Sequence, residues 1–140
     1  MLTLFKEVWD ADAPGITLDG SLPTVVYEAV GRVASPADDV PWARVTVRHT
    51  GGSQTSLAGD GPRRKFDRFG IITVSVFHPV ALARGLSVGY KLVSLARSAF
   101  EGKTTPGQIW FRDARIVEVG LSGSTYQWNA SAEFRYEELV

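Results

Sequence analysis

Four cationic side chains lie close together in the sequence and are the residues best suited to contact a partner. Arg63, Arg64, Lys65 and Arg68 end or follow residues 51–65, a polar, glycine-rich stretch with almost no large apolar side chains. Loops of this length without internal structure are usually functional or disordered. Positive charge beside such a loop suits an acidic neighbouring subunit or DNA phosphates, and a merely solvated loop is the alternative. We predict that these four residues contact another subunit or a partner.

Patterns typical of catalysis, metal binding or cofactor binding are incomplete in this sequence. Residues 10–15 begin like a calcium loop, but Ser21 stands where a bidentate glutamate is required. Gly61 is followed by Pro-Arg and not by the Lys-Ser/Thr of a phosphate-binding loop. The two histidines, His49 and His78, fall in or at the end of predicted strands and are not spaced as metal ligands. We therefore predict a protein that is not an enzyme, without catalytic residues, cofactor or metal.

Composition and charge narrow the possible classes of protein further. The chain has 140 residues, which fits one domain, and its 15 basic and 15 acidic residues give no global field that would recruit DNA or a membrane. It contains no cysteine, which excludes disulfides and thiolate chemistry. The N-terminal segment lacks the pattern of a signal peptide, and no apolar run approaches the ~20 residues of a membrane span. We expect a protein made in a reducing cytosol, with no membrane partner.

The elements that position any site follow from hydrophobic periodicity. Residues 71–77 are mostly β-branched or aromatic, as in a buried strand. Residues 86–100 then place apolar side chains at three- and four-residue steps, as in a helix, and Gly102 stands at the expected C-cap. The other predicted elements are a helix over 1–12 and strands over 24–30, 42–49, 66–78, 108–119 (with a break near 113–114) and 126–136. We predict residues 51–65 to be the loop of a wide antiparallel hairpin.

The last predicted strand has the cleanest alternation in the chain. Its apolar side chains face one way and its polar side chains, from Gln127 to Arg135, face the other, which is typical of an antiparallel sheet with one buried face. The polar face is long and uncharged in the middle, so it could meet water, a neighbouring subunit or a lumen. The fold class predicted is α+β. It consists of an antiparallel sheet, or else a mixed one, with the N-terminal helix and the longer helix on one face and a glycine-rich hairpin loop.

Taken together, these features resemble the small tail terminator (tail completion) proteins of long-tailed bacteriophages. The resemblance lies in the order of features over nearly the whole chain and not in a catalytic motif. One departure is that residues 85–89 (GLSVG) include small residues where a more apolar helix start is expected. The features are the N-terminal helix, PTVVY (23–27), PWARVTV (41–47), the glycine-rich hairpin, RFG (68–70) leading into ITVSVFHP (72–79), the helix ending in AFEG (99–102) and the closing strand with FRYEE (134–138).

The resemblance implies one domain over residues 1–140 that binds and does not catalyse. Copies of the chain would form a ring, a hexamer, at the head-proximal end of the tail tube in the virion, and this ring would be assembled in the host cytoplasm. The ring would stop the polymerisation of the tail tube protein and offer a surface to the head–neck connector protein. DNA passing through the lumen is a further contact that the resemblance implies.

Three other functions remain open from the sequence. The nearest is a head–tail joining or neck protein of similar build. The second is a small ligand-binding or enzymatic α+β domain with a pocket under the long loop. The third is a nucleic-acid-binding regulator, against which the balanced charge and the lack of a recognition-helix pattern argue.

Overall fold

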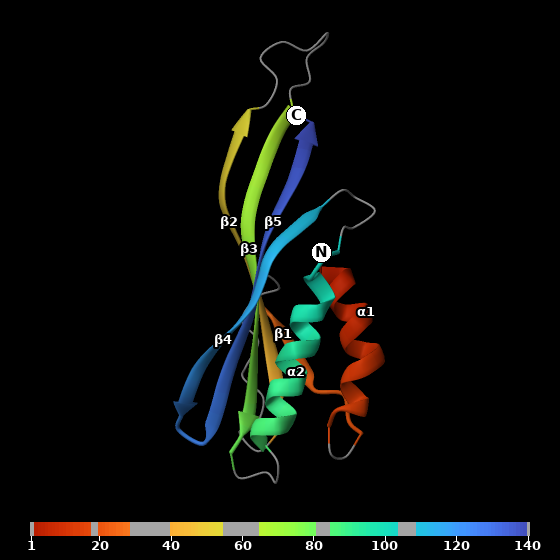
Figure 1. The fold of residues 1–140 in the computed structure, drawn as a ribbon, viewed down its shortest axis with the longest axis vertical. Helices are drawn as coiled ribbons and strands as arrows, with labels where there is room; N and C mark the ends of the chain where they lie inside the picture. The colour runs from red at the N-terminus through yellow and green to blue at the C-terminus, as the bar shows by residue number, and fades with distance from the viewer. Residues whose placement is uncertain are drawn as a thin grey trace.

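The computed structural model describes residues 2–17, 20–28, 40–54, 65–80, 85–103 and 109–139. Its elements run along the chain as shown in Figure 1. They are α1 (Leu2–Asp12), the 3-10 turn η1 (Ala13–Gly15), β1 (Thr24–Tyr27), β2 (Trp42–Gln54), β3 (Lys65–Pro79), α2 (Gly85–Phe100), β4 (Trp110–Ser122) and β5 (Thr125–Leu139). No helix within these described ranges is long and apolar enough to cross a membrane.

The five strands form one mixed sheet in the order β1-β2-β3-β5-β4. β1 pairs with β2 in parallel, and the other neighbours pair antiparallel. The predicted α+β class, with a sheet that is antiparallel or mixed, is confirmed. β5 lies between β3 and β4, so α2 connects two strands that are not neighbours, and β4 becomes the far edge of the sheet.

The predicted antiparallel hairpin is confirmed, but its loop is shorter than predicted. The strand β2 continues through Gln54, with Gly51 opposite Phe69 and Gly52 opposite Arg68. At the other side β3 already begins at Lys65. The predicted loop boundaries, 51 and 65, were therefore both wrong. Gly51 and Gly52 are tolerated in β2 because they pair with β3, and a register shift between His49 and Gly51 accommodates them. Residues 55–64 lie outside the described part of the chain.

Both helices lie side by side on one face of the sheet and cover only its lower half (Figure 1). α1 buries Phe5 and Trp9 against this layer. Phe100 at the end of α2 links the layers, because its ring lies 6.3 Å from Phe5 of α1 and 5.2 Å from Phe111 of β4. As predicted, α2 ends before a left-handed glycine, Gly102, with φ 66°.

The small residues at the start of α2 have a structural reason. Gly89 is buried in α2 directly against the indole ring of Trp128 on β5, and a Cβ at this position would overlap that ring. The missing side chain lets the helix approach the sheet over a large aromatic residue. A more apolar helix start, which the tail terminator resemblance led us to expect, would not fit above Trp128.

The predicted break in the strand near residues 113–114 is also confirmed. The pairing of β4 with β5 shifts register between Arg112 and Arg115, and Asp113 has a positive φ of 53°. An extra residue of this kind bends a strand and increases its twist. A second shift follows between Glu118 and Gly120. The two bulges bend β4 while it stays paired with β5, and Figure 1 shows its curved course.

The upper ends of β2, β3 and β5 extend beyond the helices as a three-stranded arm (Figure 1). We use this name for residues 48–54, 65–71 and 133–139, which pair with one another across the sheet. Gly70 at the base of the arm lies under the ring of Phe134. Nearby, His49 Nε2 lies 3.0 Å from the hydroxyl of Tyr136. Side-chain contacts therefore replace the helix layer as the support for this part of the sheet.

Candidate interaction surfaces

The predicted basic cluster is only partly within the described structure. Arg63 and Arg64 lie outside the described residues. Lys65 is the first residue of β3, opposite Leu139 of β5, and Arg68 lies within the same strand. Lys65, predicted as the last residue of the loop, is therefore a strand residue, whereas Arg68 lies in the strand that was predicted for it. Whether the four residues act together as a contact site stays a prediction.

Arg68 has partners within its own chain. Its Nε lies 3.0 Å from Glu138 Oε2, and its guanidinium lies 5.1 Å from the centre of the Phe66 ring. An exposed pair of this kind contributes little to stability and leaves the guanidinium able to exchange partners. Sequence reasoning could not find Glu138, because the two residues are 70 positions apart and meet only through the β3–β5 pairing.

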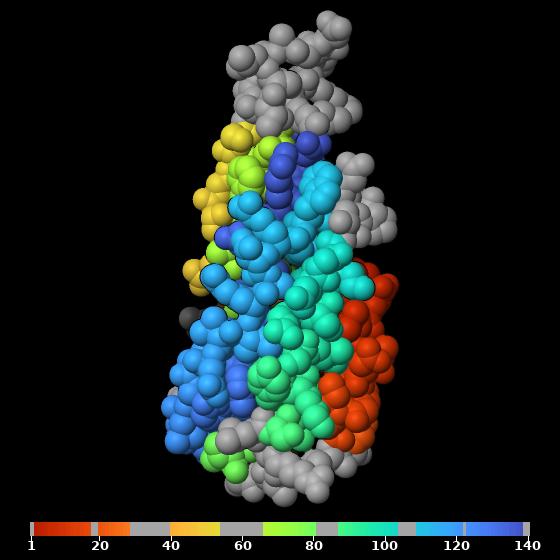
Figure 2. Space-filling model, viewed as in Figure 1, coloured from red at the N-terminus to blue at the C-terminus, as the bar shows by residue number. Residues whose placement is uncertain are grey.

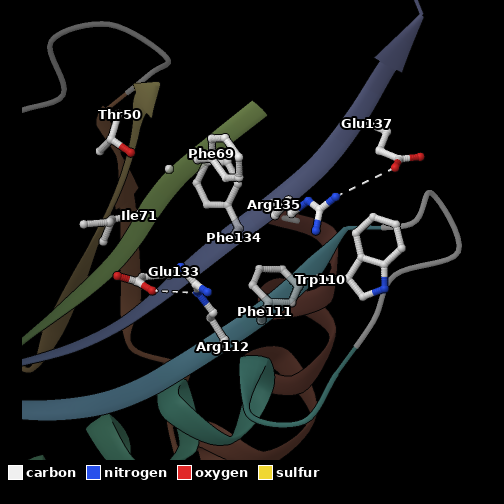
Figure 3. Close-up of a pocket in the computed structure, with 11 residues that line it drawn as sticks. Thr50, Phe69, Ile71, Trp110, Phe111, Arg112, Glu133, Phe134, Arg135 and Glu137 are labelled. Atoms are coloured by element: carbon white, nitrogen blue, oxygen red, sulfur yellow. Dashed lines mark hydrogen bonds and ion pairs between the residues drawn. The ribbon is translucent and has the colours of Figure 1, made fainter. Parts of the chain in front are cut away.

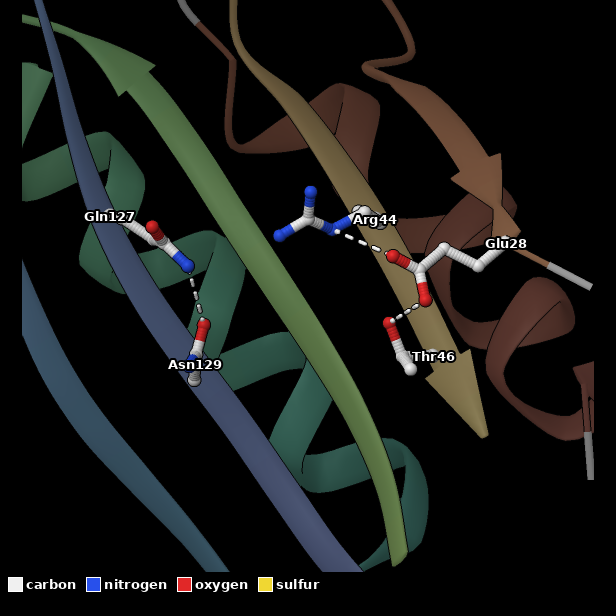
Figure 4. A network of polar contacts seen from close by, with 5 residues as sticks. All are labelled: Glu28, Arg44, Thr46, Gln127 and Asn129. Carbon is white, nitrogen blue, oxygen red and sulfur yellow. Dashed lines mark hydrogen bonds and ion pairs between the residues drawn. The ribbon is translucent and has the colours of Figure 1, made fainter. Parts of the chain in front are cut away.

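The face of the sheet opposite the helices, which we call the open face, carries the polar side chains predicted for β5. In Figure 4 the helices lie behind the sheet, and the side chains of Arg44, Gln127 and Asn129 lie in front of it. Gln127 Nε2 donates to Asn129 Oδ1 over 3.1 Å. Glu28 approaches Arg44 Nε at 3.8 Å and accepts a 3.1 Å hydrogen bond from the Thr46 hydroxyl. These contacts order the polar groups without any described helix covering them.

A pocket of about 520 Å³ opens on this face at the base of the arm (Figure 3). Aromatic side chains supply much of its wall, chiefly Phe69 of β3 and Trp110 of β4. The register places Phe69, Arg135 and Trp110 in one row, and Ile71, Glu133 and Arg112 in the next. The bulge after Arg112 bends β4 at this level, and the bent strand forms one side of the pocket.

Both arginines that line this pocket have carboxylate partners, in the pocket or beside it. Arg112 Nε lies 2.9 Å from Glu133 Oε2 (Figure 3), and Arg135 Nη2 lies 2.9 Å from Asp67 Oδ2. The Arg135 guanidinium also lies 3.9 Å from Glu137 Oε1. Because each arginine already faces a carboxylate, the pocket offers no unbalanced charge to a small anion. We interpret it as an aromatic recess with a neutral polar rim.

The edge strand β4 exposes apolar side chains that the sequence analysis did not single out. Leu121 is 65% exposed and Trp110 is 40% exposed, which is unusual for an edge that faces only water. The signal was present in the sequence as the spacing of these residues within 108–121. It could not be interpreted before the structure placed β4 at the edge of the sheet. The exposed large apolar residues of this strand are Trp110, Val117, Val119 and Leu121.

The two histidines do not come together. His49 lies opposite Gly70 of β3, and His78 follows Gly70 by eight residues, or about 26 Å along the strand. His78 is buried, with Nδ1 3.0 Å from the carbonyl oxygen of Pro79, to which it donates. Within the described ranges, no group of three His, Asp or Glu side chains is placed to hold a metal ion.

We expect His78 to make the stability of the fold depend on pH. Burial lowers the pKa of its imidazole from the ordinary 6.5, and the contact with Pro79 offsets only part of this effect. Below about pH 6.5 the unfolded chain therefore binds a proton that the folded chain does not, so the free energy of unfolding falls as the pH falls. Urea unfolding between pH 8 and 5 measures this slope. The variant His78→Gln should show a shallower slope, and parallel curves for both proteins would contradict the assignment.

No protein-family model matches this sequence. No curated protein matches it either. Among solved structures, one whose name describes no function is similar over 96% of this chain and 94% of its own, with a TM-score of 0.57 and 12% sequence identity. At this identity the similarity shows the fold alone, namely that the same arrangement of helices and strands over the whole length occurs in another protein.

Proposed function

We propose that this chain is a structural subunit that forms a ring at the end of a bacteriophage tail tube. In this role it stops tube polymerisation and provides the surface that the head joins. The sequence resemblance to tail terminator proteins is the origin of the proposal. The observation that supports it best is that the subunit presents two unlike sides, both suited to contact another copy.

The two sides are the two edges of the sheet. At one edge lies β4, thirteen residues long and exposing the four apolar side chains named above. At the other edge lies β1, only four residues long and parallel to its neighbour. An exposed edge strand with apolar side chains is an aggregation hazard unless a partner covers it. Because the edges differ, contacts between copies are head-to-tail, and such contacts close into a ring when the rotation permits.

The other proposed partners follow from the same arrangement. The arm projects beyond the helix layer and is the part of the subunit best placed to reach the tail tube protein or the head–neck connector protein. The open face carries ordered polar groups with paired charges, which suits a lumen through which DNA passes without being held. The cationic residues Arg63, Arg64, Lys65 and Arg68 remain our proposed contacts with another subunit or a partner, and two of them, Lys65 and Arg68, belong to this arm.

Electron microscopy of lysates tests the proposal, with the gene deleted from the parent phage and restored from a plasmid as the control. We expect overlong tubes without heads in the deletion, because nothing then stops the tube from growing. Restoring the gene should return tails of normal length.

Other outcomes assign the protein elsewhere. Tails of normal length lying beside filled heads would move it to the head–tail joining or neck position. Intact, infectious particles would contradict a structural role in the tail. In that case the pocket at the base of the arm becomes the leading site, and a thermal-shift screen with small aromatic compounds would test it.

A further inference from the structure

We propose that the exposed stripe of α1 formed by Thr3, Glu7 and Asp10 in one copy docks on α2 and β4 of the next copy, and that this contact closes the ring. The inference rests on the proposed function and specifies how its subunits meet. The occupant of the α2–β4 surface is thus a second copy of this chain. Figure 2 shows α2 lying between β4 on one side and α1 on the other, so the two surfaces are on different sides of the molecule.

The receiving surface is a groove between α2 and β4 that is lined by cationic and aromatic side chains. Its volume is about 460 Å³, and Tyr90, Arg97 and Arg115 are among the residues that line it. Tyr90 is 53% exposed, which is typical of an interface residue. Along α2 the positions Tyr90, Ser94 and Arg97 fall at i, i+4 and i+7, which makes them one stripe of about 10 Å.

The arginines of the groove still have capacity to bind an acid. Arg115 has no ion-pair partner among the described residues and is exposed. The Nε of Arg97 is buried and makes no hydrogen bond within the described structure, although Glu101 Oε2 lies 3.5 Å away as an ion pair. Because this nitrogen is buried, a carboxylate of another copy would have to reach the terminal nitrogens of the guanidinium, whose side chain is 37% exposed. The groove also contains Glu118, but its carboxylate accepts a 2.7 Å hydrogen bond from Tyr126 and is engaged there.

The docking surface on α1 has the opposite charge. Its exposed carboxylates outnumber its single lysine, Lys6, which forms an ion pair with Asp10 at 3.5 Å. Asp10 and Asp12 lie in the last turn, which contains no basic residue, although the helix dipole disfavours carboxylates there. A local arrangement that costs stability in the single chain is often explained by a functional contact. Cations supplied by a neighbouring copy would compensate for it.

The two stripes also match in length. Thr3, Glu7 and Asp10 fall at i, i+4 and i+7 of α1, the same spacing and the same length of about 10 Å as the α2 stripe. The middle positions are Glu7 and Ser94. Two stripes that pack along each other bring their centres together in either relative direction, so this pair is the best reporter of the contact.

Cysteine cross-linking tests the docking directly, since the chain has no cysteine of its own. Two single variants, Glu7→Cys and Ser94→Cys, are purified, confirmed to be folded by circular dichroism, mixed and oxidised mildly. We expect the mixture to give a disulfide-linked species of twice the monomer mass, and each variant alone to give none. The control partner is Thr46→Cys, in β2 on the open face and away from β4, which should not link to Glu7→Cys.

The outcomes separate this inference from the proposed function. A link between two Glu7→Cys chains would mean a two-fold contact and would overturn head-to-tail docking. No mixed link, either in purified protein or in cells that assemble phage with both variants, would overturn the α1–groove contact. Deletion of the gene would then still decide, by the length of the tubes, whether the protein terminates tails through a different interface.

Discussion

Replacing Gly70 by alanine is expected to destabilise the protein by about 3 kcal/mol, at the upper end of the usual overpacking penalty. A Cβ at Gly70 would overlap both the Phe134 ring and the carbonyl oxygen of Arg48. The ring is buried, and the carbonyl belongs to the β2–β3 pairing, so neither can move without loss of packing or of a ladder hydrogen bond. Thermal unfolding should show a midpoint lower by about 10 °C.

The same hairpin offers a matched control. A Cβ at Gly51 meets no atom of the described structure within 4 Å, and Gly51 is not among the glycines with positive φ. Gly51→Ala should therefore be neutral or stabilise by a few tenths of a kcal/mol, because it reduces the freedom of the unfolded chain. If Gly70→Ala were as stable as Gly51→Ala, the close approach of Phe134 to the strand would be wrong.

Gly89→Ala is expected to cost up to about 2 kcal/mol even though alanine favours helices. The gain in helix propensity is about 1 kcal/mol, whereas the new methyl group would overlap the Trp128 ring, which is only 3% exposed. Overpacking of a buried contact typically costs about 1–3 kcal/mol. Urea unfolding of the variant and the parent measures the difference.

A double-mutant cycle distinguishes the clash from a general effect on the helix. In the background Trp128→Leu, which by itself costs about 3 kcal/mol, the change Gly89→Ala should become stabilising because the obstacle is gone and the helix propensity remains. An equal cost of Gly89→Ala in both backgrounds would show that the helix does not rest on Trp128. Residues in contact are expected to show this kind of coupling.

Several features of the fold could be predicted because they depend on local patterns. Strict alternation indicated the buried side of β5, and Trp128 and Phe134 are buried as expected. The three- and four-residue steps of α2 indicated its helix, and Gly102 its end. The predicted limits of the hairpin loop were wrong. Gly51 and Gly52 pair with β3, and local propensity does not include pairing with another strand.

The candidate surfaces were predicted less well, for a related reason. The sequence drew attention to a cluster of charge, but the partners of Arg68 and Arg135 are about 70 residues away and arise only from the pairing of β3 with β5. α2 likewise buries Val93 and Phe100 in addition to its predicted stripe, because α1 and the sheet both pack against it. A pattern along one segment cannot say how many neighbours that segment will have.

The amino-acid sequence by itself determined which segments are helix and which are strand, since period, turn residues and caps act over a few positions. It also determined the charge balance and the absence of thiol chemistry. Only the tertiary structure decided that β5 lies between β3 and β4, and therefore that β4 is an exposed edge. The groove beside α2 follows from that order, because strand order depends on contacts between segments that are distant in the chain.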